Sequence, residues 1–413
     1  MIEQLVNEAE ADCLEQFIAI NKRVEYNQKK LLDAFHEKRI GDYHFSSTDG
    51  YGYDDLGRDT LEELYAHVFG AEDALVRPQL VSGTHAISTA LQGLLRPGDE
   101  LIYITGKPYD TLEQVIGLTG DESGSLKDYN IDYQDVALLE DGAVDFDRVK
   151  EVVSNQTKVI GIQRSKGYDD RPSFTIDQIE EMVMFVKSIN EDLIIFVDNC
   201  YGEFVEEKEP TEVGVDIIAG SLIKNPGGGL VRAGGYIAGR EDLINHVANR
   251  MTAPGLGRDA GATINMLQEM YQGFFLAPHV VGEALKGAVF AARLLEKLGV
   301  KTTPAYDAKR TDLIQSVTFN DADQMVSFCQ SIQRFSPINS YVQPYPSEMP
   351  GYDEKVIMAA GTFIQGSSIE LSADGPIKPP YIAFIQGGLT YAHVKIAITE
   401  SVKQLISDGY INE

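Results

Sequence analysis

The sequence predicts an α/β fold in which a mainly parallel sheet is covered by helices on both faces. Between about residues 75 and 225, short runs rich in β-branched apolar residues alternate with stretches at helical spacing, a pattern typical of consecutive strand–helix–strand units. Two of these runs lead into a charged residue, Asp198 and Lys224. The 413 residues exceed the size of one hydrophobic core, so we expect a second, smaller α+β domain towards the C-terminus.

The composition disfavours several classes of partner. A net charge of −28 repels nucleic acid and anionic membrane surfaces. The acidic first residues lack the apolar core of a signal peptide, and no apolar run approaches the ~18 residues of a membrane span. Cys13, Cys200 and Cys329 are widely spaced, which fits a cytoplasmic protein without disulfides. Because no His/Cys/Asp cluster has ligand spacing, we expect no metal site.

The N-terminal part of the chain is predicted to be helical. Apolar side chains recur near helical spacing from residue 2 to about 40, which indicates one or two helices on the body of the molecule or on a partner subunit. Residues 41–60 form a loop rich in Gly, Asp, Ser and Tyr, and such long loops are often functional. The next helix is expected over Leu61–Phe69, capped by Asp59 or Thr60.

An anion-binding turn is predicted at Ser82, Gly83 and Thr84. A strand-like stretch gives way at these small residues to an apolar helix. Such a turn presents unpaired backbone N–H groups and about half a positive charge, which suits a phosphate. Alternatively, Ser82 is an ordinary N-cap residue with no ligand.

An aromatic ring is expected at the carboxyl edge of the same sheet. The strand-like run LIYIT, residues 101–105, leads through a short turn to Tyr109 at the start of the following helix. Tyr109 can stack on a flat cofactor, although a packed rim tyrosine is the simpler interpretation of this residue taken alone.

Asp198 and Lys224 are the main candidates for chemistry. Asp198 follows the apolar run LIIFV, and Lys224 ends the run DIIAGSLIK before the chain breaks at Asn225-Pro226 and three glycines. Because the carboxyl ends of strands line the ligand crevice of an open α/β sheet, we expect both charges to face one crevice. The spacing alone also allows a buried or rim ion pair, or two unrelated surface charges.

Pyridoxal phosphate chemistry requires a pair of this kind. A lysine forms the Schiff base, and an aspartate keeps the pyridine nitrogen protonated so that the ring withdraws electrons from a carbanion. We expect Lys224 to be partly desolvated, so that its neutral amine is accessible near neutral pH. Ser221, three residues earlier, can reach a phosphate beside the imine. Penicillin-recognising serine hydrolases share the S-x-x-K spacing, but their S-D-N and K-T-G tripeptides are absent here.

Lys166 is the chief rival for the Schiff-base role. It follows the strand-like run KVIGIQR, residues 158–164, and no S-x-x-K precedes it. We expect it to lie in a polar turn that is wetter than the surroundings of Lys224, so the assignment goes to Lys224.

The second half of the chain contains a predicted domain change. RAGGYIAGR predicts a strand that pairs back into the first sheet, and a long helix over 279–298 is closed by Gly299. We therefore place an N-terminal helical segment at 1–45, a large domain at 46–299 and a small domain at 300–413. The other expected elements are helices at 176–189, 241–250, 321–333 and 391–407, and strands at 313–319, 356–364, 367–373 and 381–385.

Several stretches resemble fold-type-I pyridoxal phosphate enzymes of the cystathionine and methionine lyase kind. The most specific are VDNCYGEF, GSLIKNPGGGLVRAGGYIAG and YIAFIQGGLTYAHVKIA. More closely, the chain is similar to methionine gamma-lyase-related proteins, which are often labelled aluminium-resistance or cystathionine beta-lyase-like, and the resemblance covers most of its length. It implies a mainly parallel seven-stranded sheet between helices, a smaller C-terminal α+β domain and covalently bound pyridoxal 5'-phosphate.

The resemblance also implies individual roles. Lys224 carries the internal aldimine, Asp198 pairs with the pyridinium nitrogen, and Tyr109 stacks on the ring. The residues that it places around the phosphate are Ser82, Gly83, Thr84 and Ser221.

A neighbouring subunit is expected to complete the site. The lyase family uses a tyrosine and an arginine, in a loop before the phosphate helix, to reach the phosphate of the next subunit. Tyr53 and Arg58 are the candidates, with Tyr51 as an alternative because the spacing is longer than the usual Tyr-x-Arg. A homodimer or homotetramer with shared sites is therefore implied.

One departure from the better-known lyases concerns the substrate carboxylate. Those enzymes bind it with an arginine near the C-terminus, but the last arginine of this chain is Arg334. Arginine is the side chain best suited to bidentate carboxylate recognition. Either another arginine serves, with Arg164, Arg171, Arg232 and Arg258 as candidates, or the substrate differs.

The expected activity is β- or γ-elimination from an amino acid, with a sulfur leaving group and with Lys224 as the base that removes the α-proton. Aminotransfer or racemisation on the same scaffold is an alternative. A non-catalytic cofactor-binding protein with a regulatory or stress-response role is a third hypothesis.

Overall fold

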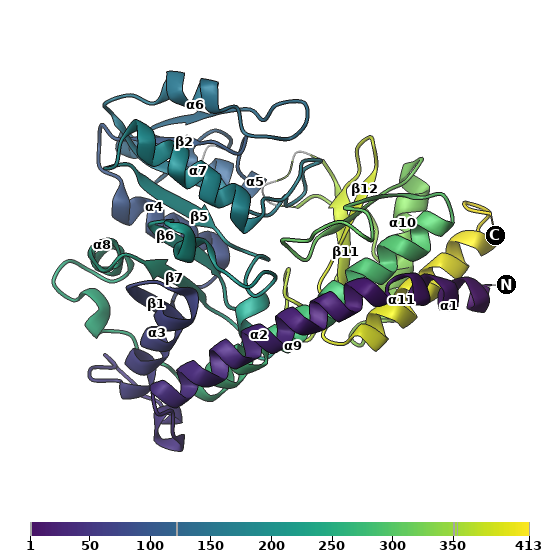
Figure 1. The fold of residues 1–413 in the computed structure, drawn as a ribbon, viewed down its shortest axis with the longest axis horizontal. Coiled ribbons are helices and arrows are strands. Elements are labelled where there is room, and N and C mark those ends of the chain that lie inside the picture. The colour runs from purple at the N-terminus through teal and green to yellow at the C-terminus, as the bar shows by residue number, and fades with distance from the viewer. Residues whose placement is uncertain (1, 121–122, 350–351, 353, 413) are drawn as a thin grey trace.

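The computed structural model describes residues 2–120, 123–349, 352 and 354–412, and it contains two separate sheets (Figure 1). In the larger sheet, β7 runs antiparallel to both neighbours and all other neighbouring strands are parallel. The spatial order is β1 (Asp73–Arg77), β7 (Gly235–Gly239), β6 (Ile217–Ser221), β5 (Ile194–Asp198), β4 (Thr157–Gln163), β2 (Glu100–Tyr103) and β3 (Asp132–Asp135). The predicted seven-stranded, mainly parallel sheet is confirmed.

Helices cover both faces of this sheet because its central strands are apolar on both sides. In β5, Ile194 and Phe196 belong to one hydrophobic core, while Ile195 and Val197 belong to the other. The helices of the first face are α4 (Gly83–Leu94), α5 (Asp110–Ile116) and α8 (Glu241–Met251). Those of the second face are α3 (Leu56–Phe69), α6 (Phe146–Val152), α7 (Ile176–Ile189) and α9 (Leu267–Lys297).

Two predicted helix starts were wrong. Helix α3 begins at Leu56 rather than Leu61, because the carboxylate of Asp55 accepts the N–H of Arg58 at 2.9 Å and so caps the helix. Helix α9 begins twelve residues before the predicted start at 279, with Pro278 inside it.

The smaller sheet is antiparallel throughout. Its order is β10 (Val356–Ala359), β11 (Ser372–Pro376), β12 (Ile382–Gln386), β9 (Gln315–Thr318) and β8 (Lys301–Thr303). It packs with α10 (Ala322–Arg334), α11 (Tyr391–Ser407) and the last turns of α9 around its own core. The strand expected at 367–373 lies later, at Ser372–Pro376. We call these elements the small domain, and the seven-stranded sheet with its helices the large domain.

Helix α9 connects the two domains, and the N-terminal helices α1 (Ile2–Asp12) and α2 (Leu14–Glu37) lie along it (Figure 1). By length and composition α9 could cross a membrane, but 72% of its most apolar window is buried inside the protein. Its apolar residues therefore serve the core. Short 3-10 turns complete the fold at Asp42–Phe45, Lys127–Tyr129, Pro210–Val213, Asn225–Gly227 and Gly257–Asp259.

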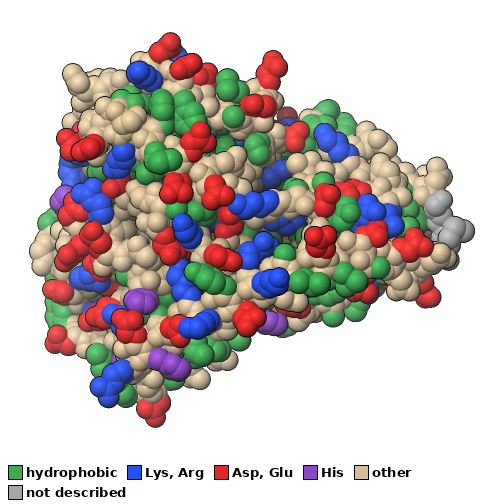
Figure 2. All heavy atoms as spheres, viewed as in Figure 1, with side chains coloured by type: hydrophobic (Ala, Val, Ile, Leu, Met, Phe, Trp, Pro, Cys, Tyr) green, Lys and Arg blue, Asp and Glu red, His purple; other side chains and the backbone are tan. Residues whose placement is uncertain are grey.

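The large negative charge is not gathered into one patch on the face shown in Figure 2. Acidic side chains are spread over both domains there, with basic side chains between them. This distribution is typical of a solvated, mixed-charge surface.

Candidate active site

The ends of β5 and β6 bring Asp198 and Lys224 to one cavity. The two strands are parallel neighbours, with Asp198 opposite Ala219 in the ladder, and Lys224 follows β6 by three residues. Both residues line a cavity of about 1030 Å³. Parallel strands end at the same edge of a sheet, which is why two residues so far apart in the chain face the same space.

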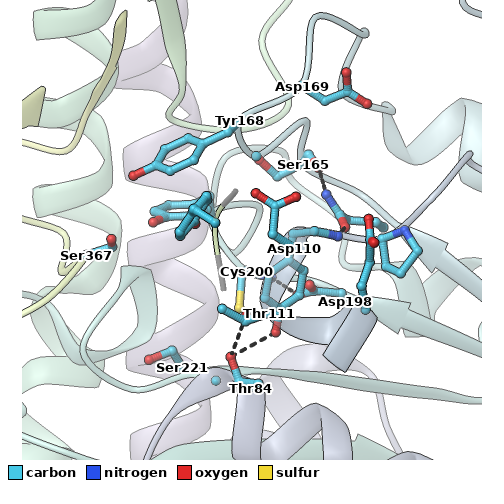
Figure 3. A pocket seen from close by; sticks show the side chains of 18 of the residues that line it. Thr84, Asp110, Thr111, Ser165, Tyr168, Asp169, Asp198, Cys200, Ser221 and Ser367 are labelled. Carbon is cyan, nitrogen blue, oxygen red and sulfur yellow. Dashed lines mark hydrogen bonds between the residues drawn. The ribbon is translucent and has the colours of Figure 1, made fainter. Parts of the chain in front are cut away.

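The cavity lies between the two domains. Its large-domain wall includes Asp198 and Lys224, and its opposite wall includes Gln365, Ser367 and Gln386. Figure 3 shows Thr84 and Ser221 at one side, and Ser165 and Tyr168 at the other. A ligand in this space is therefore contacted from both domains.

A tight turn positions Lys224. Its backbone N–H donates to the carbonyl of Ser221 at 3.4 Å, and its carbonyl accepts the N–H of Gly227 at 3.2 Å. Gly227 is required here, since a Cβ at this position would lie 1.8 Å from the carbonyl oxygen of Leu222. The Asn-Pro-Gly sequence thus fixes the direction in which the lysine leaves the strand.

The amine of Lys224 lies 4.0 Å from the centre of the Tyr201 ring, a geometry that stabilises an ammonium ion. Burial opposes the charge, but the attraction of Cys200, Tyr201 and Asp198 outweighs it and raises the pKa of Lys224 above the ordinary lysine value. We had expected a partly desolvated lysine whose neutral amine is accessible near neutral pH. Its burial acts in that direction, and the groups around it act against it.

Asp198 is buried at the floor of the cavity. Burial raises the pKa of its carboxyl, and the nearby Lys224 amine and the backbone N–H of Cys200 act in the opposite direction. The Cys200 N–H donates to Oδ1 of Asp198 at 3.1 Å. A buried carboxyl fixed in this way suits a protonated heterocyclic nitrogen, whose charge would replace the solvation that Asp198 has lost.

The N-terminus of α4 forms an anion cradle. Ser82 accepts the N–H of His85 with its side chain at 3.0 Å and the N–H of Ala86 with its carbonyl at 3.0 Å. The N–H groups of Gly83 and Thr84 precede any intrahelical acceptor and are left for a ligand. Ser82 can therefore cap the helix while the helix start binds an anion, because the cap engages the N–H groups of His85 and Ala86 and not those of Gly83 and Thr84.

The cradle also has the right amount of space. A Cβ on Gly83 would lie 3.1 Å from Cβ of Ser221 and 3.3 Å from Sγ of Cys200, so a larger residue here would be tightly packed between the helix and β6. The hydroxyl of Ser221 lines the same cavity. These two backbone donors and one hydroxyl fit a phosphate group.

Tyr109 is tied to this cradle. Its hydroxyl donates to Oγ1 of Thr84 at 3.0 Å, and its backbone N–H donates to Oε1 of Gln163 at 2.8 Å. Burial and the charge of Asp198 raise the pKa of Tyr109 above its usual range, so the phenol stays neutral. The ring is held in the cavity wall between the cradle and the β4 edge.

Tyr53, Tyr51 and Arg58 lie outside the cavity. Tyr53 and Tyr51 are 52% and 71% exposed and stack on each other. Arg58 is buried, and its guanidinium donates to the carbonyls of Gly52 and Gly261 and to the carboxylate of Asp59. Within one chain these residues shape the loop rather than the site. Their contact with a neighbouring subunit stays a prediction.

None of the four candidate arginines lines the cavity among the described residues. Each guanidinium is occupied elsewhere. The partners are Asn199 and Glu206 for Arg164, the carbonyls of Gln163, Ser165 and Pro172 for Arg171, Glu269 for Arg232, and Glu62 and Asp73 for Arg258.

Lys166 lies in the cavity wall, and its environment was predicted wrongly. We had expected a wet turn, but the residue is 2% exposed. The sequence also gave no role to Tyr201, whose ring faces the Lys224 amine. Its φ of 69° is unusual for a residue other than glycine. A sequence does not reveal such a backbone conformation, so the only available signal was that Tyr201 lies three residues after Asp198.

Comparison with known proteins identifies the family of this chain. A protein-family model described as methionine gamma-lyase matches residues 2–406. The Bacillus subtilis protein YnbB is 61% identical over 100% of this chain and 98% of its own. The crystal structure of a carbon-sulfur lyase involved in aluminium resistance from Clostridium novyi is 49% identical, with a TM-score of 0.94, and the match covers 98% of this chain and 96% of that one.

Two further structures extend the comparison. A Listeria monocytogenes protein, described as a candidate cystathionine beta-lyase involved in aluminium resistance, is 58% identical with a TM-score of 0.96, over 97% of this chain and 99% of its own. The O-acetylhomoserine (thiol)-lyase candidate of Campylobacter jejuni, solved with a pyridoxyl-lysine, is 18% identical with a TM-score of 0.56, over 83% of this chain and 85% of that one, and shares the fold. Since the family model spans nearly the whole chain, this protein belongs to the methionine gamma-lyase family.

Proposed function

We propose that this protein is a pyridoxal-phosphate-dependent carbon–sulfur lyase that acts on a sulfur amino acid by β- or γ-elimination. The observation that carries the proposal is the meeting of an amine, a buried carboxyl and an anion cradle in one cavity, at Lys224, Asp198 and the start of α4. Membership of the methionine gamma-lyase family supports it.

The residues present fit the cofactor group by group. The N–H groups of Gly83 and Thr84 and the hydroxyl of Ser221 would hold its phosphate, and Asp198 would hold its ring nitrogen. Lys224 would provide the covalent attachment. When bound, pyridoxal phosphate supplies an electron sink for negative charge on the α-carbon of an amino acid.

Lys224 is the group that can move the α-proton. Once a substrate amine has taken its place, its Nζ can accept the proton from the α-carbon and donate a proton to a departing sulfur. The raised pKa of Lys224 reflects in part the negative charge of Asp198. When Asp198 is paired with a protonated ring nitrogen, that attraction is neutralised, and the amine can lose its proton more easily.

Asp198 and Tyr109 prepare the site rather than exchange protons. The Asp198 carboxylate keeps a proton on the ring nitrogen through a charge-assisted hydrogen bond. The ring of Tyr109, fixed by the hydrogen bonds to Thr84 and Gln163, offers a flat surface for an aromatic cofactor. Together they hold the reacting atoms in position, which is a large part of the rate enhancement in enzymes.

The proposal is tested with two substitutions. Lys224→Ala should abolish turnover and the visible absorbance of the lysine-linked cofactor together, and a variant that keeps this absorbance would contradict the assignment. Asp198→Asn should still bind the cofactor but lose most of the rate, and an unchanged rate would exclude the electron-sink role. Product analysis separates the reactions, because elimination releases ammonia and a keto acid, whereas aminotransfer requires an acceptor keto acid and racemisation yields the opposite enantiomer.

We also propose that the protein works in the cytoplasm as a homodimer or homotetramer. The exposed, stacked pair of Tyr51 and Tyr53 is available to a second subunit, and aromatic residues are enriched at such interfaces. Sedimentation of the purified protein, compared with a Tyr51→Ser/Tyr53→Ser variant, measures the assembly. If the variant assembles and binds the cofactor as the wild-type protein does, this loop does not contribute to a site shared between subunits.

A further inference from the structure

The cavity contains a buried cation that the functions assigned above do not use. Lys166 is 2% exposed and lines the cavity together with Lys224. Its backbone N–H donates to Ser173 at 3.0 Å. Across the described residues, no hydrogen bond or ion pair reaches its Nζ. A buried ammonium group without a partner is unfavourable, so its position calls for an anionic ligand.

Two carboxylates near Lys166 interact with other groups. Asp312 accepts the hydroxyls of Ser165 and Ser173 at 2.6 and 2.5 Å, and exposed Asp169 lies 3.9 Å from Arg171. Burial lowers the pKa of Lys166, and the charges of Asp312, Asp170 and Asp169 only partly offset that effect. An anion that enters the cavity would meet a cation with no competing short contact.

The segment around Lys166 is fixed from both domains. Gln163, at the end of β4, lies opposite Asp198 in the ladder and accepts the N–H of Tyr109. Five residues on, the ring of Tyr168 lies 5.2 Å from that of Phe384 in the small domain. Lys166 therefore lies between the cofactor-binding wall and the small-domain wall.

This segment is also remote from the anion cradle. Ser165 and Tyr168, the labelled residues nearest to Lys166 in the chain, lie across the cavity from Thr84 and Ser221 (Figure 3). The donors of α4 and the segment that carries Lys166 thus lie on opposite sides of the cavity. When the phosphate of the cofactor occupies the cradle, the carboxylate of an amino acid joined to that cofactor would lie away from the cradle.

We propose that Lys166 binds the carboxylate of the amino-acid substrate, a role for which the cavity offers no arginine among the described residues. The inference rests on the proposed function, because it requires an amino acid at Lys224. Lys107 and Lys378 also line the cavity but are exposed at its rim, where water screens their charge. A desolvated ammonium group such as that of Lys166 recognises a carboxylate far more strongly than an exposed one.

The experiment compares L-methionine, L-cystathionine and L-alanine with their carboxamides, in which the carboxylate is replaced by a neutral group. Dissociation constants are measured by calorimetry on cofactor-loaded protein, alongside KM and kcat. Wild-type protein should bind each acid about 10-fold or more tightly than its amide, as expected for a charged hydrogen bond. Lys166→Met should lose that preference and raise KM with a smaller effect on kcat, and Lys166→Arg should restore part of it. Lys378→Met is the matched control and should keep the preference.

Two results would overturn the inference. One is a wild-type protein that holds the cofactor yet binds no acid of the series more tightly than its amide. The other is a Lys166→Met variant, or a Lys166→Gln variant if the first does not fold, that keeps the wild-type preference. Neither result touches the proposed function, which fails separately if wild-type protein forms no lysine-linked cofactor absorbance or releases no keto acid from any substrate.

Discussion

The turn after Lys224 allows a quantitative prediction for Gly227→Ala. An added Cβ would lie 1.8 Å from the carbonyl oxygen of Leu222, and real Cβ contacts below 3.0 Å are essentially absent, so the two groups must separate by at least 1.2 Å. The turn cannot retreat towards α9, because a Cβ on Gly273 would already lie 2.2 Å from the carbonyl oxygen of Gly227. The displacement must therefore reach Lys224, whose carbonyl accepts the N–H of Gly227.

A shift of about 1 Å in a reacting group costs roughly 100-fold in rate, so Gly227→Ala should lower kcat/KM for elimination by about that factor. Overpacking should also cost about 1–3 kcal/mol of stability. The assay is keto-acid release at saturating cofactor, with circular dichroism to confirm that the variant is folded.

Gly255→Ala is the control for a general loss of stability. Its φ is 90° and a Cβ there meets no atom within 4 Å, so backbone strain of about 1–3 kcal/mol is its main effect. It should lose stability to a similar extent and keep its rate. A folded Gly227→Ala protein with the kcat/KM of wild type would refute the argument that this turn fixes the position of the lysine.

Three further outcomes are expected. Glu62→Gln should destabilise the protein by about 3–5 kcal/mol in urea unfolding, because Glu62 and Arg77 form a fully buried ion pair at 2.5 Å. The control is Glu151→Gln, in an exposed ion pair, which should change stability by less than about 0.5 kcal/mol. Equal effects of the two substitutions would contradict this prediction. Tyr109→Phe removes the hydrogen bond to its threonine partner at 3.0 Å and should weaken cofactor binding about 5-fold, which dialysis against cofactor measures; unchanged affinity would count against that contact. Burial raises the pKa of Glu203 to about 8, so the folded state keeps a proton that the unfolded state releases near pH 4.5, and stability should fall as pH rises from about 4.5 to about 8. Glu203→Gln should flatten that slope in thermal unfolding measured across this range, and an identical slope would show that another group is responsible.

The sequence predicted the large sheet and the cavity residues well because both depend on local patterns. Buried parallel strands have continuous β-branched runs, and the residues that follow them share one edge of the sheet, as Asp198 and Lys224 do. The cradle of Gly83 and Thr84 was likewise predictable, because small residues before an apolar helix leave N–H groups unpaired.

The features that were missed depend on contacts between distant segments. Lys166 lies in a polar stretch that does not indicate its burial, and the nearby Tyr168 packs against Phe384 of the small domain. Strand β3 has the sequence DYQD and mostly exposed side chains, so nothing apolar marks it as an edge strand. The long helix was expected to start at 279, but α9 begins at Leu267 and contains Pro278.

The packing of α1 and α2 along α9 has a consequence for how the chain is synthesised. Glu10 bonds to Lys395 and to Tyr391 at 2.7 Å, and Asp12 bonds to Arg293. Helices α1 and α2 are synthesised long before α9 and α11, so these partners become available only after more than half of the 413 residues have been made. Until then the apolar sides of α1 and α2 are not packed against α9, so the growing chain exposes hydrophobic surface that chaperones can bind.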